Sequence, residues 1–127
     1  MAIFMICAGL LGILGAALAL NVGRMRNVKK VSLGDGGDKE LQAAIRAHGN
    51  FMEFVPICLI LIYLVGGDFQ ERAGAVMAII LVLARLAHAA GMLGYMRNGR
   101  VIGAVSTITL LFVAAIWSIV DGVGFRL

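Results

Sequence analysis

Three polar side chains at helical spacing could together bind a zwitterionic ligand. Arg46, Asn50 and Glu53 follow one another at intervals of four and three residues, so they share one face of a helix. At a helical rise of about 1.5 Å per residue, Arg46 and Glu53 lie about 10 Å apart, roughly the length of an extended tripeptide. The guanidinium could bind a carboxylate, the amide a peptide group, and the carboxylate an amino group. The same three side chains could instead form a polar network that only tethers helices.

A second polar set follows further along the chain. Arg85, His88, Met92 and Tyr95 are spaced so that they share a helix face. Arg85 and Glu53 lie at similar distances from the outer ends of their helices, and we expect them to form an ion pair, which could be purely structural. For His88, a hydrogen-bonded packing role is favoured over that of a proton carrier.

The elements that position these residues are membrane-spanning helices. The chain has 127 residues, of which 61% are hydrophobic and 14% charged, whereas a soluble domain carries about 25% charged residues. One spanning helix needs about 20 mostly apolar residues, so this length holds several spans with short loops and no separate soluble domain. We predict an all-α, integral membrane four-helix bundle that forms a single domain over residues 1–127. The expected helices are 2–23, 39–65, 71–95 and 101–120.

Basic residues are concentrated in two of the predicted loops. Those of the first loop are Arg24, Arg26, Lys29, Lys30 and Lys39, and those of the third are Arg97 and Arg100. The second loop and the C-terminal tail hold only Arg72 and Arg126. Because basic loops favour the cytoplasmic side, we predict that both termini face away from the cytoplasm.

Other kinds of site have little support. Cys7 and Cys58 form no C-x-x-C pair and are interpreted as small buried apolar residues. No His, Cys or Asp cluster accompanies His48, so no metal is expected. No basic stretch interleaved with aromatic residues is present, so no nucleic acid partner is expected.

Two segments of the chain, in the first loop and the second helix, resemble a known family. The run Leu41–Pro56 is similar to the second-helix signature of the MAPEG superfamily, the membrane-associated proteins in eicosanoid and glutathione metabolism. The segment Val31–Asp38 resembles the first loop of the bacterial branch of that family. The resemblance covers essentially the whole chain, and its further residues are Arg85, His88, Gly91 and Arg100.

The resemblance implies a homotrimer in the bacterial inner membrane, with glutathione bound as a thiol co-substrate between neighbouring subunits near the cytoplasmic side. By motif position, Arg46, Asn50 and Glu53 would hold the tripeptide. His48 would supply a polar contact, and Arg24 would face the ligand. The remaining ligand-binding residues would be Arg85 and His88. Arg100 would be the catalytic residue, because it matches the arginine that stabilises the thiolate.

The chain departs from the family pattern at three positions. Met92 stands where eicosanoid-handling members often have tyrosine, Gly49 replaces a bulkier or basic residue, and Val101 follows Arg100 where one branch has serine. These changes argue against prostaglandin- or leukotriene-type specificity. They leave the expected glutathione-holding residues intact.

The function expected from these features is that of a glutathione transferase or peroxidase. The thiolate of bound glutathione would attack apolar electrophiles or lipid hydroperoxides in the bilayer, because no Cys, Ser or Lys of the chain has an activating neighbour. A non-catalytic lipid-binding membrane protein of the same family is an alternative. A small proton-coupled drug exporter using Glu53 is a third reading, which the neighbouring Arg46 and Arg85 disfavour because cations keep a carboxylate ionised.

Overall fold

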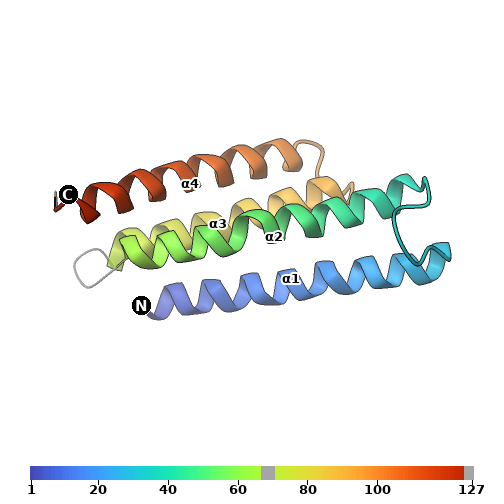
Figure 1. Cartoon of the computed structure of the whole chain (residues 1–127), viewed down its shortest axis with the longest axis horizontal. Helices are drawn as coiled ribbons and strands as arrows, with labels where there is room; N and C mark the ends of the chain where they lie inside the picture. Colours follow the sequence, from blue (N-terminus) through green and yellow to red (C-terminus); the bar gives the residue numbers. More distant parts are fainter. Residues whose placement is uncertain (67–70, 125–127) are drawn as a thin grey trace.

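The computed structural model describes residues 1–66 and 71–124, and this part of the chain is a bundle of four helices. They are α1 (Ala2–Lys29), α2 (Lys39–Val65), α3 (Glu71–Met92) and α4 (Gly99–Gly122), and they run alongside one another (Figure 1). Each of the four is long and apolar enough to cross a membrane. The predicted all-α membrane bundle is therefore confirmed, while Arg126 lies outside the described residues.

The first helix extends further than predicted. It ends at Lys29 rather than at residue 23, and Lys30 terminates it in the left-handed conformation with φ 58°. Arginine and lysine are good helix formers, and Arg26 and Lys29 in the last turn complement the negative end of the helix dipole. Arg24 is therefore presented from a helix rather than from a loop.

The third helix is shorter than predicted. It ends at Met92, because Gly94 turns the chain with φ 84° and the amides of Tyr95 and Met96 both donate to the carbonyl of Ala90. Tyr95 consequently lies exposed in the connection and does not continue the helix face of Arg85. The second helix has the predicted bounds, and α4 begins at Gly99 and ends at Gly122.

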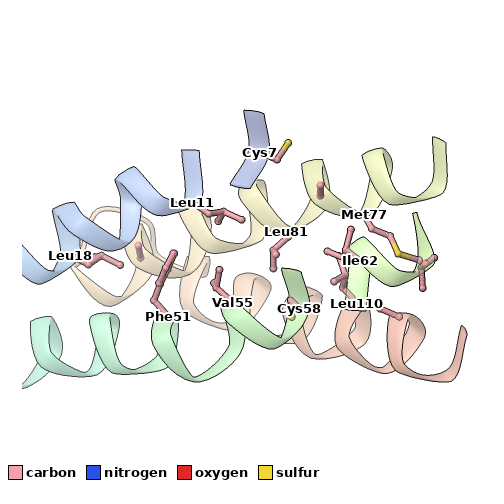
Figure 2. Packing of buried hydrophobic residues seen from close by; sticks show 14 of the residues in the cluster. Cys7, Leu11, Leu18, Phe51, Val55, Cys58, Ile62, Met77, Leu81 and Leu110 are labelled. Atoms are coloured by element: carbon pink, nitrogen blue, oxygen red, sulfur yellow. The ribbon is translucent and has the colours of Figure 1, made fainter. Parts of the chain in front are cut away.

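The bundle has α2 and α3 at its centre, with α1 and α4 on opposite sides (Figure 1). Both central helices contact each other and both outer helices. In the core, Leu11 of α1, Val55 of α2 and Leu81 of α3 are all at most 3% exposed, and their side chains lie between the ribbons (Figure 2). Cys7 and Cys58 are buried free thiols, as expected.

Three glycines bring α3 and α4 into backbone contact at the end of the bundle where these two helices are joined. A Cβ atom added to Gly103 would lie 2.6 Å from the backbone nitrogen of His88, and one added to Gly91 would overlap the backbone of Arg100. Gly99 is packed in the same way against Ala87. Small residues allow such close approach between membrane helices. As a result, the first turn of α4 lies directly against the turn of α3 that carries His88.

Candidate ligand-binding site

A polar cavity of about 370 Å³ lies between α2, α3 and the start of α4. This volume is within the range of about 300–1,000 Å³ that is usual for ligand pockets. Four of the predicted site residues line it, and three further lining residues are polar or lie at the close helix contact. The lining residues are Lys39, Gln42, Ala43, Arg46, Asn50, His88, Gly91, Met92 and Arg100.

Glu53 continues the polar stripe of α2 outside this cavity. Its Oε1 lies 3.5 Å from Nη1 of Arg46, and the two side chains are 52% and 58% exposed. The expected ion pair between Arg85 and Glu53 is therefore wrong. Arg46 lies two turns away on the same helix face and reaches the carboxylate, whereas Arg85 is turned into the bundle. Gly49 lies beside the pair, where a Cβ atom would be 3.8 Å from Nη1 of Arg46.

The Arg85 side chain is buried in the middle of the bundle and is only 1% exposed. Its Nη2 donates to Oδ1 of Asn50 over 2.9 Å and lies 3.4 Å from Nδ1 of His88. Its guanidinium carbon lies 5.6 Å from the centre of the Phe51 ring, within the range of a cation–π interaction. Within the described residues, Nε and Nη1 of Arg85 have no hydrogen-bond partner. Arg85 thus supports two residues that line the cavity.

A second polar cavity, of about 440 Å³, adjoins the first. Arg24 lies here, with its Nη2 donating to Oδ1 of Asn21 over 3.4 Å. The two cavities share Lys39, Ala43 and Met92 as lining residues. In the single chain, Arg24 lines this second cavity and not the one that Arg46 lines.

The structure thus brings four of the eight predicted site residues together and places the other four elsewhere. Arg46, Asn50, His88 and Arg100 line one cavity. Arg24 lines the adjoining cavity, and Glu53 and Arg85 contact members of the first group. His48 is half-buried and lines neither cavity.

Two lining residues were missed by the sequence analysis. Lys39 and Gln42 precede Arg46 by seven and four residues, so the same helical spacing, extended toward the start of α2, would have included them. Phe51 was also missed, because an aromatic residue in an apolar helix carries no signal that an arginine lies on its ring.

The start of α2, next to Lys39, is fixed by a charged junction with α1. Asp38 caps the helix by accepting a 2.9 Å hydrogen bond from the backbone N–H of Leu41. Lys29 lies 2.9 Å from Asp38 and 2.7 Å from Glu40. The hydrogen bond from Leu41, together with that from Lys29, holds the pKa of Asp38 below its ordinary value of 3.8.

The described residues do not form a candidate metal site. No group of three or more His, Cys, Asp or Glu residues among them lies close enough together to hold an ion. The polar lining of the first cavity consists of cations, amides and one imidazole.

Fold and site together define a class of protein: a four-helix membrane protein with a cation-lined cavity between helices at one end of the bundle. The sequence model of the MAPEG family matches residues 4–120, and the chain belongs to this family. It is 34% identical over 108 residues to "Inner membrane protein YecN" of Escherichia coli strain K12, an alignment that covers 78% of this chain and 79% of the relative. The protein of the same name from Escherichia coli O6:H1 strain CFT073 matches to the same extent. The resemblance read from the sequence is thereby confirmed.

Proposed function

We propose that this protein is a glutathione-dependent transferase or peroxidase of the bacterial inner membrane. The observation that carries the proposal is the 370 Å³ cavity that gathers Arg46, Asn50, His88 and Arg100 from three helices. Membership of the MAPEG family and the similarity to an inner membrane protein support it. Glutathione serves as the thiol co-substrate.

The charges of the site complement those of glutathione. The cations Arg46 and Arg100 line the cavity and suit the carboxylates and the thiolate. Glu53, just outside the cavity, is the acidic group of the stripe and suits the amino group. The tripeptide would thus lie along α2, with its ammonium end toward the middle of the helix.

A second copy of the chain would complete this site. Glu53 lies about 18 Å from the far end of α2 at a rise of about 1.5 Å per residue, which places it inside a hydrocarbon layer of about 30 Å. Both Glu53 and Arg46 are more than half exposed on the single chain. Charged residues at such depth normally face other protein or a wet cavity, because exposing them to lipid is costly. We therefore propose that further copies of the chain enclose the ligand. Membership of the MAPEG family favours a homotrimer, with the basic loops on the cytoplasmic side.

Arg100 is the proposed catalytic residue. It lies in the first turn of α4, where free backbone N–H groups and the helix dipole favour an anion. A cation here stabilises the glutathione thiolate relative to the thiol. The thiolate sulfur then donates its electron pair to an electrophilic carbon and the leaving group departs. In the peroxidase reaction, two glutathione thiols are oxidised to the disulfide while a hydroperoxide is reduced to an alcohol and water.

The test is calorimetry of the detergent-solubilised protein with glutathione, followed by turnover measurements with a set of apolar model electrophiles and hydroperoxides. Arg100→Ala should lower turnover about 100-fold while affecting glutathione affinity less, because removing one donor from a developing anion typically has an effect of about that size. Arg97→Ala is the matched control, since Arg97 is exposed, lies three positions away and lines neither polar cavity. Absence of glutathione binding to the wild-type protein would refute the proposal, and unchanged turnover of Arg100→Ala would refute the role of Arg100.

A specific observation also favours the lipid-binding alternative. An apolar groove of about 660 Å³ lies between α3 and α4, and residues such as Val76, Ile80 and Val113 line it. Glutathione binding without turnover of any electrophile or hydroperoxide would favour this alternative. The exporter reading is disfavoured by the contact between Glu53 and Arg46.

A further inference from the structure

The buried guanidinium of Arg85 determines which way the Asn50 amide faces. An arginine side chain has only donors and no acceptor. Its contact with Asn50 can therefore be made only by the amide oxygen, as the 2.9 Å hydrogen bond from Nη2 to Oδ1 shows. Because Asn50 lines the polar cavity, its NH₂ group is the end of the amide left for a ligand. Asn50 thus presents its amide donor toward the cavity.

The same guanidinium selects the protonation state of the His88 ring. Nη2 of Arg85 lies 3.4 Å from Nδ1 of His88. A proton on Nδ1 would set two N–H groups against each other, so this contact favours a lone pair on Nδ1 and the ring proton of neutral His88 on Nε2. His88 also lines the cavity, and the group that it can offer to a ligand is Nε2–H.

We propose that Arg85 is a positioning residue that turns Asn50 and His88 into hydrogen-bond donors toward the cavity. Arg85 itself is 1% exposed and is not among the residues that line the cavity. It acts on a ligand through these two neighbours. Phe51, whose ring lies against the guanidinium, helps to hold the cation in the bundle.

This arrangement defines the chemical class of group that the cavity accepts. With Asn50 and His88 fixed as donors, and with Arg46 and Arg100 also in the lining, the cavity suits acceptor-only anionic groups such as a thiolate or a carboxylate. The acceptors among these four side chains are Oδ1 of Asn50 and Nδ1 of His88, and both face the buried guanidinium, which disfavours an ammonium group in the cavity. The identity of the ligand as glutathione rests on the proposed function, whereas the orientation of the two side chains does not.

The orientation can be tested without any ligand. The chain has two histidines, so protein labelled with ¹⁵N-histidine gives two ring systems by solid-state NMR in lipid bilayers. We expect His88 to be neutral and protonated at Nε2 alone, and Arg85→Met to introduce the Nδ1–H form. His48 is the internal control, because it lines neither polar cavity, and its signals should stay unchanged. A wild-type His88 protonated at Nδ1, or a folded Arg85→Met protein with an unchanged His88 ring, would overturn the proposal.

A second variant separates positioning from simple structural support. Asn50→Asp keeps an acceptor for Arg85 but replaces the NH₂ donor with a carboxylate oxygen. It should leave the melting temperature unchanged or raised, while weakening glutathione binding about tenfold or more, which corresponds to about 1.4 kcal/mol. Asn27→Asp makes the same chemical change at an exposed position of α1 and should bind as the wild type does.

The outcomes distinguish the two proposals from each other. Equal glutathione binding by Asn50→Asp and the wild type would show that the Asn50 amide is not a donor to the ligand, and the positioning role would be refuted. If the wild-type protein binds no glutathione, the proposed function is refuted, and the histidine spectra still decide the role of Arg85.

Discussion

The two ends of the α3–α4 helix pair are built in opposite ways. At the end where the helices are joined, Gly91, Gly99 and Gly103 bring the backbones into direct contact, and the polar cavity lies beside them. Toward the other end, larger side chains such as Met77 and Trp117 line an apolar groove of about 660 Å³. The α3–α4 pair is therefore tightly packed next to the charged residues of the polar cavity, whereas a groove separates the two helices where their facing side chains are apolar.

The difference shows where a membrane bundle needs exact packing. Lipid tails are as apolar as the helices, so association depends on close contact rather than on a hydrophobic driving force. Close contact at the joined end fixes Arg100 of α4 next to His88 of α3. Positions of charged groups matter there, because their interactions change steeply with distance in a medium of low dielectric constant. The apolar end has no such requirement.

The largest effect expected on ligand affinity tests whether glutathione binds only at the polar end of the bundle. Arg46→Ala and Glu53→Gln should each weaken glutathione binding about 30-fold or more. Each variant removes the protein's partner in a charged contact with the ligand, and such a loss in a buried contact costs about 2 kcal/mol or more. Thr109→Val changes a residue of the apolar groove and should bind glutathione as the wild type does. Calorimetry measures the affinities, after size-exclusion chromatography has shown that each variant is folded. If Thr109→Val weakened glutathione binding as much as Arg46→Ala and Glu53→Gln do, glutathione binding would not be confined to the polar end.

A smaller effect is expected from adding one methyl group at the closed end. The Cβ atom of Gly103→Ala would meet the backbone of α3, and overpacking of this kind costs about 1–3 kcal/mol. Gly12→Ala is the matched control, since no atom lies within 4 Å of the position of its Cβ. Thermal unfolding in detergent should therefore show a lower melting temperature for Gly103→Ala alone. Equal melting temperatures for the two variants would show that the helices separate easily at this end.

The smallest expected effect concerns the partly exposed junction of Lys29, Asp38 and Glu40, which holds the start of α2 next to the polar cavity. The pKa of Asp38 is lower in the folded protein than its ordinary value of 3.8, because its carboxylate accepts hydrogen bonds from Leu41 and Lys29. The ionised group therefore stabilises the fold above about pH 3.8, and this contribution is lost as the pH falls through the lowered value. Asp38→Asn retains a capping oxygen but cannot titrate. Between pH 6 and pH 3, the melting temperature of the variant should therefore fall less than that of the wild type, and parallel curves would contradict this role.

Much of the fold could be predicted from the sequence because its signals are local. The bounds of α2 follow from Asp38 as a capping residue and from Gly66 after the last apolar turn. The end of α1 was misplaced, because the charges of Arg24, Arg26 and Lys29 indicate a loop, although arginine and lysine are good helix formers. Tyr95 was assigned to α3, because its spacing continues the face of Arg85 while the turn at Gly94 gives only a weak signal.

The sequence by itself determined that this is a four-helix membrane protein of the MAPEG family and that Arg46, Asn50 and Glu53 share one face of α2. Spacing along one helix determines such relations, because the helical repeat is constant. Only the tertiary structure decided that Arg85 of α3 contacts Asn50 of α2 and not Glu53, and that its guanidinium lies beside His88. It also decided that Arg100 joins the same cavity and that Arg24 does not. These relations depend on the rotation and separation of neighbouring helices, which are set by packing at residues such as Gly103 and not by the period of any one helix.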